Sequence, residues 1–329
     1  MLSLISYTLI SNKRIVSFLP SATEILYDIG AGSQIIGVTH NCNYPKEAKP
    51  KPRVINSSFD ASTMSSKEID NKIVELFGNG NDIYIVNEEI LKELKPDLIV
   101  AQGICEVCSP FSKEIKRAIS ILGYNPKVII LDPRNISDIL DNITEIATNI
   151  GKIKEGKNLV RSLEKKINTI KKIAELKTNK EDLPKILCLE WIDPFFTAGH
   201  WVPEMVEIAG GINGLSKSKE QSKRTSLKQI KKFDPDKIIL MPCGFNIDRT
   251  INEYKYTAIL NNNQEWNNLR AIKNNELYVV DAGSYFSKPG PRTITGIEIL
   301  AKIISPNEFN NIQTPENSYS KLIINDLTK

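Results

Sequence analysis

Thiol and imidazole side chains occupy a recurring position in this chain of 329 residues. Five of them follow short apolar runs: His40, Cys42, Cys105, Cys108 and Cys243. In open α/β sheets, ligands bind outside the carboxyl ends of parallel strands, so we expect these side chains to gather at one edge. Thiolates and imidazoles are ligands for zinc, iron or an iron–sulfur cluster, and they could also contact the cobalt of a corrinoid.

Two other interpretations of the same residues stay open. The Cys105-Glu106-Val107-Cys108 segment could be a redox dithiol, or its thiols could be structural, and His40 could cap a loop. Five cysteines in a chain of this size do not form a disulfide framework, so we expect free thiols. Cys188 lies in the middle of an apolar run and is expected to act as a small core residue.

A second group of side chains could contact an organic ligand at the same edge. Its members combine aromatic rings with a few polar groups: Glu190, Trp191, His200, Trp201, Tyr285, Phe286 and Arg292. Such a set suits the flat face of a tetrapyrrole-like ligand. Core packing is the alternative for the aromatic residues, including Phe195 and Phe196, and Arg292 could instead brace its own loop.

These candidates must be positioned by an alternation of strands and helices. Most of the expected strands are continuous apolar runs, as in parallel sheets covered on both faces. They are Ile15–Leu19, Ile35–Thr39, Ile83–Val86, Leu98–Gln102, Val128–Asp132, Lys185–Trp191, Lys237–Pro242 and Leu277–Asp281. The pattern predicts an α/β fold with two Rossmann-like lobes and mostly parallel sheets.

One long helix is expected between the lobes, over Lys152–Lys177. Val160, Leu163 and Ile167 begin an apolar stripe with spacings of three and four residues, and no proline interrupts it. The lobes also repeat a unit, since residues 90–100 and 230–240 each read as a helix end, a Pro-Asp turn and a buried strand. The sequence therefore predicts an N-terminal lobe (1–150), a linking helix (151–179), a C-terminal lobe (180–305) and a loosely held tail (306–329).

Several short motifs, taken in order, resemble the class III periplasmic-binding-protein superfamily, in particular its vitamin B12 and iron-siderophore branch. The motifs that carry the resemblance are Pro20-Ser21-Ala22-Thr23-Glu24, Gly37-Val38-Thr39-His40, Pro194-Phe195-Phe196-Thr197-Ala198-Gly199, Ala209-Gly210-Gly211 and Pro289-Gly290-Pro291-Arg292. The resemblance covers roughly Arg14 to Ile304. It implies two lobes on a single backbone helix and a ligand bound in the cleft between them.

The resemblance also assigns roles to single residues. Glu89 corresponds to the glutamate with which the N-terminal lobe docks onto a membrane permease, whereas Lys228 reverses the charge of its C-terminal counterpart. Trp191 matches an aromatic residue of the ligand cleft. Asn41, which we also expect to contact the ligand, stands where the family has a tyrosine, and Ser284 where it has an aspartate.

Composition excludes some partners and leaves others. A net charge of +4, from 43 basic and 39 acidic residues, favours neither nucleic acid nor an anionic membrane. No segment is apolar for long enough to span a membrane. Because no leader pattern is recognised in the first residues, we expect a cytoplasmic protein, or an extracytoplasmic one if the start is misassigned or export is non-standard. We also expect a monomer.

The motifs of common enzymes are absent from the sequence, including a phosphate-binding loop and a nucleophile elbow. Together with this absence, the resemblance implies a non-enzymatic substrate-binding protein that takes a corrinoid, a siderophore-like or another metal-bearing small molecule. Its partner would be an ABC permease. The alternative is a cytoplasmic metal- or iron–sulfur-dependent enzyme on the same scaffold, with Cys42, Cys105 and Cys108 as ligands and Glu190 or His200 as the acid or base.

Overall fold

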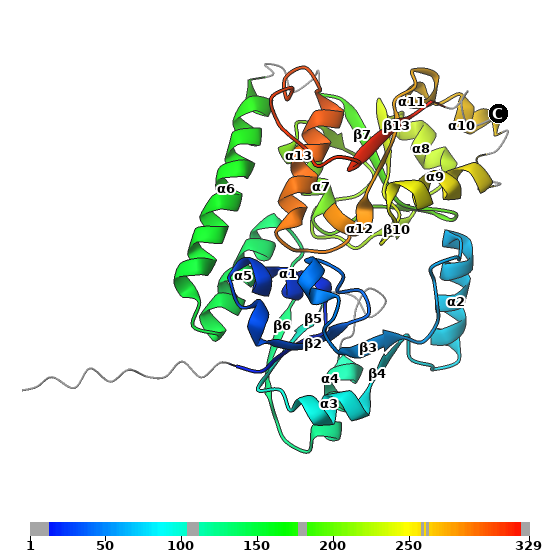
Figure 1. Ribbon diagram of the computed structural model, residues 1–329. Coiled ribbons are helices and arrows are strands. Elements are labelled where there is room, and N and C mark those ends of the chain that lie inside the picture. Colours follow the sequence, from blue (N-terminus) through cyan, green and yellow to red (C-terminus); the bar gives the residue numbers. More distant parts are fainter. Residues whose placement is uncertain (1–12, 104–111, 177–182, 258–259, 261–262, 324–329) are drawn as a thin grey trace, which may run out of the picture. The chain divides into compact units, whose positions relative to one another are not determined.

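The computed structural model describes residues 13–103, 112–176, 183–257, 260 and 263–323, which fold into two compact units (Figure 1). The N-terminal unit comprises Met1–Ser58, Tyr84–Leu131 and Asn142–Leu159. The C-terminal unit comprises Phe59–Ile83, Asp132–Asp141 and Val160–Lys329. The sequence-based limits at residues 150, 179 and 305 stay a prediction.

The N-terminal unit is built on a six-stranded sheet with the order β4-β3-β2-β1-β5-β6. All neighbours are parallel except β3 and β4, which pair antiparallel at one edge. The central strands are buried on both faces, which is why they read as continuous apolar runs. The strands are β1 (Ile15–Ser17), β2 (Ile35–Thr39), β3 (Arg53–Ser57), β4 (Tyr84–Val86), β5 (Leu98–Gln102) and β6 (Lys127–Leu131).

The C-terminal unit is built on a seven-stranded mixed sheet. Its strand order is β10-β8-β7-β11-β12-β13, with β9 paired to β7. The central strands β7, β11 and β12 are parallel, whereas β8, β10 and β13 add antiparallel edges. The strands are β7 (Lys185–Ile192), β8 (Phe195–Thr197), β9 (Ile212–Asn213), β10 (Lys223–Arg224), β11 (Lys237–Leu240), β12 (Leu277–Val280) and β13 (Tyr319–Leu322).

Helices alternate with the strands along the chain, and both α5 and α6 have residues in each unit. No described helix is both long enough and apolar enough to cross a membrane. The helices are α1 (Pro20–Asp28), α2 (Ser66–Gly78), α3 (Glu88–Leu94), α4 (Ser112–Leu122), α5 (Ile136–Asn149), α6 (Ile153–Glu175), α7 (Val202–Ile208), α8 (Leu227–Phe233), α9 (Ile247–Tyr256), α10 (Gln264–Asn267), α11 (Arg270–Lys273), α12 (Ala282–Tyr285) and α13 (Arg292–Ile304). The predicted fold class, two α/β lobes with mostly parallel sheets, is confirmed.

The repeated Pro-Asp unit has the same function in both units. Helix α3 ends at a residue with positive φ, Lys95, and helix α8 ends in the same way at Asp234. After each proline, an aspartate carboxylate accepts a hydrogen bond from the backbone N–H next to a central strand. Asp97 accepts from Arg14 at 2.9 Å, and Asp236 accepts from Lys185 at 2.7 Å. The repeat therefore joins a helix end to the start of a sheet.

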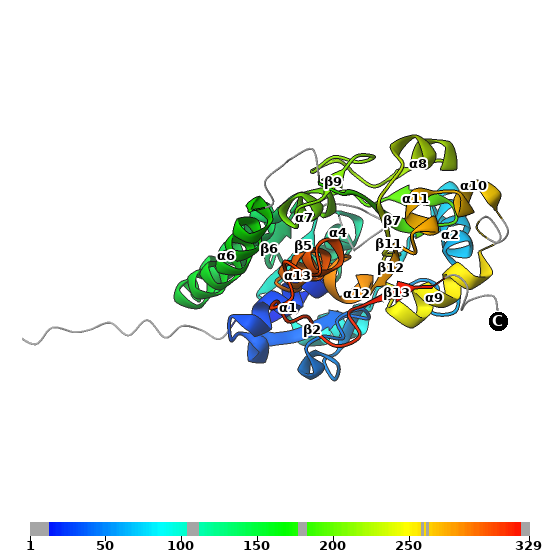
Figure 2. The same cartoon turned by 90° about the horizontal axis from the view of Figure 1, so that it is seen from above.

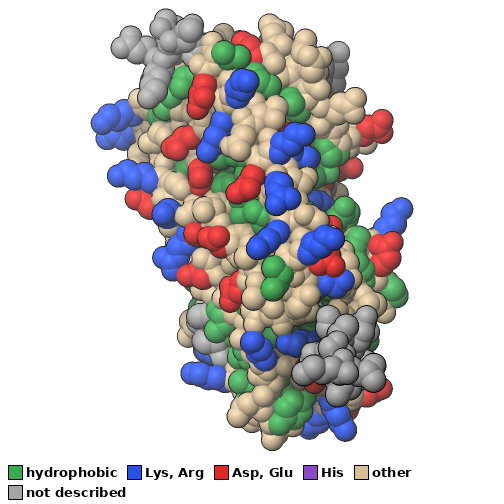
Figure 3. All heavy atoms as spheres, turned by 90° about the vertical axis from the view of Figure 1, so that its left-hand side faces the viewer, with side chains coloured by type: hydrophobic (Ala, Val, Ile, Leu, Met, Phe, Trp, Pro, Cys, Tyr) green, Lys and Arg blue, Asp and Glu red, His purple; other side chains and the backbone are tan. Residues whose placement is uncertain are grey.

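The long helix α6 confirms the predicted stripe. Leu163, Ile167, Ile170 and Ala174 are buried, and the lysines between them are exposed. Figure 3 views the molecule from the side on which Figure 1 draws α6, and basic and acidic side chains are interspersed on this face. The lysine-rich stretches of α6 are thus solvated, as amphipathic periodicity predicts.

The sequence missed five strands, namely β3, β8, β9, β10 and β13. Strands β9 and β10 have two residues each, and both residues of β10 are exposed charged side chains, so no apolar run marks it. Strand β13 lies within the expected tail, residues 306–329. It pairs antiparallel with β12 and buries Leu322, so this part of the tail belongs to the sheet.

Candidate functional site

A polar pocket of about 590 Å³ opens at the carboxyl ends of β11 and β12. All of its lining residues belong to the C-terminal unit. Its lining includes the side chains of Ser62, Asn246, Asp248, Arg249, Asp281, Ser284 and Lys288. The pocket lies where ligands bind in parallel α/β sheets, and its volume is within the range of small-molecule sites.

The local sequence shapes this pocket through helix caps and glycines. Asn246 accepts a hydrogen bond from the Arg249 N–H at 2.9 Å and begins α9, and Asp281 begins α12 by accepting from the Ser284 N–H at 3.0 Å. A Cβ atom on Gly283 would lie 2.9 Å from the carbonyl oxygen of Gly244. Only glycine at residue 283 lets the loops after the two strands approach each other this closely.

The charges that line the pocket balance each other. Asp248 and Asp281 carry negative charge, whereas Arg249 and Lys288 carry positive charge. Burial lowers the pKa of the Arg249 guanidinium, and the nearby carboxylates of Glu253 and Asp60 oppose this effect. An arginine stays protonated under such conditions, so the pocket offers both signs of charge beside hydroxyl and amide groups.

Trp191 connects the predicted ligand residues to this pocket. Its half-buried ring meets the Phe245 ring edge-on at 5.6 Å, and the Arg249 guanidinium lies 3.6 Å from the centre of the Phe245 ring. Glu190, beside it, accepts a hydrogen bond from the Ser222 hydroxyl at 2.7 Å. Its backbone oxygen accepts from the N–H of the half-buried Cys243 at 3.2 Å.

The remaining predicted ligand residues of this unit differ in how much surface they offer. Trp201 and Phe286 are 5% and 2% exposed, and the Trp201 indole donates to the Phe286 carbonyl at 2.9 Å, so both belong to the packing of the unit. Tyr285 and Arg292 are half-buried, with the guanidinium 5.8 Å from the ring centre. His200 is also half-buried and has a positive φ of 55°.

The neighbouring aromatic residues Phe195 and Phe196 also differ in burial. Phe195 is buried and stacks on Trp266 at 5.7 Å in the core of the C-terminal unit. Phe196 is half-buried, with the Arg224 guanidinium 5.3 Å from its ring centre. Core packing therefore describes Phe195.

The predicted metal ligands His40 and Cys42 of the N-terminal unit differ in solvent exposure. Cys42 is fully buried, with its sulfur 3.2 Å from the Thr23 hydroxyl and 3.3 Å from the Thr39 hydroxyl. Burial is the main cause that lowers the pKa of the half-buried His40, with a smaller effect of Arg53 in the same direction, while a backbone hydrogen bond with Ile55 acts against it. Asn41 is exposed.

Cys105 and Cys108 lie outside the described residues. Within the described parts of the chain, no three His, Cys, Asp or Glu side chains are grouped as a metal ion would require. The metal set of His40, Cys42, Cys105, Cys108 and Cys243 therefore stays a prediction. Cys188 is 2% exposed in β7, where burial raises the pKa of its thiol to about 12, in agreement with a core residue.

Sequence reasoning missed most of the pocket. The expectation that ligands bind at the carboxyl ends of strands identified Cys243 as a candidate. It did not identify Gly244 and Asn246, which follow within three residues. A glycine and a helix-capping asparagine directly after a buried strand were the available signal. Ser62 carried no signal, because it reaches the pocket from a segment far away in the sequence.

The parallel sheets, the long helix and a pocket at the strand ends define a two-lobed α/β binding protein. The family model for the periplasmic binding proteins matches residues 15–283. The chain belongs to this family. As predicted, it is a substrate-binding protein of the ABC-importer type.

Known proteins resemble the chain over most of its length. It is 29% identical over 303 residues to the uncharacterised ABC transporter substrate-binding lipoprotein YvrC of Bacillus subtilis, covering 90% of this chain and 81% of the relative. It is 23% identical to the vitamin B12-binding protein of Vibrio vulnificus, covering 87% and 88%. A periplasmic heme-binding protein from Pseudomonas aeruginosa has a similar fold, with a TM-score of 0.67, 16% identity and coverage of 90% and 93%.

The expectation of a cytoplasmic protein is wrong. The matching family is periplasmic, and the relative from Bacillus subtilis is a lipoprotein of an ABC transporter. The expectation rested on a leader pattern that was not recognised, and a missing pattern does not identify a compartment.

Proposed function

We propose that the ligand of this importer component is a corrinoid and that one polar edge of the ligand occupies the pocket at the carboxyl ends of β11 and β12. The observation that carries the proposal is the character of this pocket. It combines hydroxyl and amide side chains with two acidic and two basic groups. A corrin ring is surrounded by neutral carboxamide arms, which both donate and accept hydrogen bonds, so this mixed lining suits them.

The balance of charge distinguishes this ligand from other metal-bearing molecules. A polyanionic iron chelate such as ferric citrate would require an excess of basic groups, and Arg249 and Lys288 are offset by Asp248 and Asp281. A buried charge without a partner is unfavourable, so a neutral ligand edge fits better. The relative from Vibrio vulnificus, which is a vitamin B12-binding protein, supports the same ligand class.

Trp191 would supply an apolar contact for the ligand beside the polar pocket. Its half-buried ring, held edge-on against Phe245, is available for the flat face of a corrin ring. Tyr285 and Arg292, which are also half-buried, are the other candidate contacts among the residues expected from the sequence.

Titration of the purified protein with cyanocobalamin, hemin and ferric citrate tests this proposal. We expect saturable binding of cyanocobalamin that is at least tenfold tighter than binding of ferric citrate, and a weaker affinity for cyanocobalamin in Lys288→Ala and Trp191→Ala. Lys154→Ala, which removes an exposed lysine from α6, is the matched control for the loss of a positive charge. Preferred binding of ferric citrate would contradict the corrinoid assignment.

The enzyme alternative is tested on the same material. We propose a binding protein without catalysis, so that cyanocobalamin should be recovered unchanged after incubation and the protein purified without added metal should be colourless. A brown protein with stoichiometric iron would support the iron–sulfur alternative instead.

We also propose that the loaded protein docks onto an ABC permease through Glu89.

A further inference from the structure

Residues 59–83, which we call the strap, leave the N-terminal unit between two paired strands. Strands β3 and β4 pair antiparallel in the N-terminal unit, and the chain between them belongs to the C-terminal unit. The strap contains α2, which lies beside elements of the C-terminal unit in both ribbon views (Figure 1 and Figure 2). The strap therefore belongs to the C-terminal unit, although the strands before and after it pair in the N-terminal unit.

Arg249 of α9 holds the beginning of the strap. Its guanidinium donates to the carbonyl oxygen of Ala61 at 2.5 Å and to that of Met64 at 2.8 Å. The same group lies against the Phe245 ring, at 3.6 Å from its centre, which limits the directions in which it can donate. Hydrogen bonds from a charged group to two carbonyls of one turn fix that turn more firmly than neutral hydrogen bonds would.

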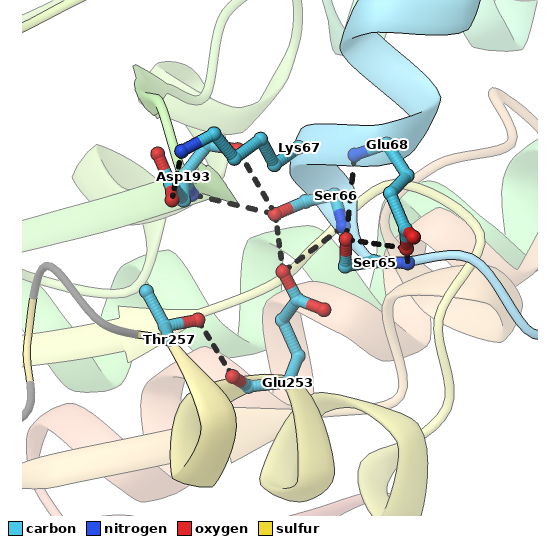
Figure 4. Close-up of polar contacts among 7 residues, drawn as sticks. All are labelled: Ser65, Ser66, Lys67, Glu68, Asp193, Glu253 and Thr257. Carbon is cyan, nitrogen blue, oxygen red and sulfur yellow. Dashed lines mark hydrogen bonds and ion pairs between the residues drawn. The ribbon is translucent and has the colours of Figure 1, made fainter.

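Glu253, one helical turn further along α9, holds the first turn of α2 (Figure 4). Its carboxylate accepts hydrogen bonds from the backbone N–H of Ser66 at 3.0 Å and from the Ser66 hydroxyl. Ser66 is fully buried, and its hydroxyl also meets the backbone oxygen and N–H of Asp193 at 3.2 and 3.3 Å. A carboxylate at a helix N-terminus is favourable because it meets free N–H groups and the positive end of the helix dipole.

Two ion pairs extend the docked surface along α2. Asp70 pairs with Arg224 of β10 at 2.6 Å, and the exposed Lys67 lies 3.8 Å from the Asp193 carboxylate. Ser65 and Glu68 form a capping box within the strap, so α2 begins at a defined residue. The strap thus contacts the C-terminal unit by a series of specific polar interactions.

The strap contributes one residue to the lining of the pocket. Ser62 lines the pocket and stands between Ala61 and Met64, the two residues whose carbonyls Arg249 binds. We propose that the strap is a wall of the ligand pocket and that Arg249 and Glu253 are positioning residues that hold this wall, so that ligand affinity depends on strap docking. The inference rests on the proposed function in one respect, namely that the ligand enters this pocket.

The two positioning residues can be separated by experiment, because Arg249 lines the pocket whereas Glu253 does not. We compare Arg249→Ala, Glu253→Ala and the control Lys72→Ala, which breaks an exposed pair within α2. Hydrogen–deuterium exchange of the ligand-free protein should increase within residues 59–83 in both positioning variants and not in the control. Affinity for cyanocobalamin should fall about 10- to 100-fold in both, as expected for the loss of hydrogen bonds to a charged group.

Three results would overturn the inference. The first is unchanged exchange of residues 59–83 in both positioning variants, and the second is increased exchange with unchanged affinity. The third is weaker binding in Arg249→Ala alone, because Arg249 would then contact the ligand and the strap would not matter. If the wild-type protein bound no cyanocobalamin, the proposed ligand would be wrong, whereas exchange would still decide whether Arg249 and Glu253 hold the strap. A thermal unfolding midpoint close to that of the wild type identifies variants that remain folded.

Discussion

His200 is held in a backbone conformation that few residues other than glycine adopt. With φ at 55°, its N–H donates to the Glu220 carbonyl at 2.6 Å, and its own carbonyl accepts from the Lys219 N–H at 2.9 Å. Burial is the main cause that lowers the pKa of the imidazole, and the charge of Arg134 acts in the same direction against that of Asp132. The lowered pKa therefore favours the neutral imidazole, in a loop whose backbone is already constrained.

This depressed pKa predicts a dependence of stability on pH. The unfolded chain takes up a proton near the ordinary histidine pKa of about 6.5, whereas the folded chain does so only at lower pH, so the free energy of unfolding decreases as pH falls below about 6.5. His200→Asn keeps a residue that tolerates positive φ and removes the titrating group. We expect the drop in the free energy of unfolding between about pH 7.5 and 5.5 to be smaller in the variant. Urea denaturation at both pH values measures it, and an equal drop in both proteins would contradict the assignment.

The residues that shape the pocket could be predicted only in part from their type. Trp191 and Glu190 were found because they end a recognisable strand, and Trp191 contacts Phe245 beside the pocket. Arg249 and Glu253 resemble ordinary surface charges of a helix, and their partners lie 185 or more residues away in the sequence. No local pattern reports such a pairing, since it depends on how the chain folds back on itself.

Helices α5 and α6 approach each other closely in the N-terminal unit because residue 156 is a glycine. A Cβ atom on Gly156 would lie 2.4 Å from the Cβ of Ala147 and 3.7 Å from the Ile143 carbonyl oxygen. Alanine would raise the intrinsic helix propensity by about 1 kcal/mol. Overpacking costs about 1 to 3 kcal/mol, so the contact with α5 decides the outcome.

We therefore expect Gly156→Ala to lower the free energy of unfolding by about 1 kcal/mol. Lys157→Ala is the matched control, because the neighbouring side chain is exposed and its removal should change stability by less than about 0.5 kcal/mol. Urea denaturation measures both. A stabilised Gly156→Ala variant would mean that α5 gives way and that propensity outweighs packing.

Strong periodicity made some elements predictable, and its absence hid others. The stripe of Leu163 and Ile167 identified α6 to within two residues at each end, and β2 and β5 were located at their observed limits. Strand β13 could not be found, because Tyr319–Leu322 alternates weakly and is defined by its pairing with β12. The contacts of the strap could not be predicted for a related reason. Helix α2 is a regular capped helix, and the surface that it contacts is formed by elements distant in the sequence.

For the whole molecule, the proposed docking onto a permease would involve one exposed charge in each unit. Glu89 is exposed in the first turn of α3, and Lys228 is exposed in the first turn of α8. In the family that the chain belongs to, we expect acidic residues at both positions to meet basic residues of the permease. Lys228 should therefore weaken an association that Glu89 strengthens.

This charge reversal predicts opposite effects of two substitutions. Glu89→Ala should weaken binding to the cognate ABC permease, and Lys228→Glu should strengthen it. Exposed ion pairs contribute about 0 to 1 kcal/mol, so each change should be about fivefold or less. Both effects should shrink as salt rises, since the Debye length falls from about 10 Å at 0.1 M to about 3 Å at 1 M.

Surface plasmon resonance with the permease in nanodiscs measures the affinities, and Glu93→Ala, which removes another exposed carboxylate from α3, is the control. An affinity for the permease that neither substitution changes at low salt would mean that the chain binds its permease through other surfaces.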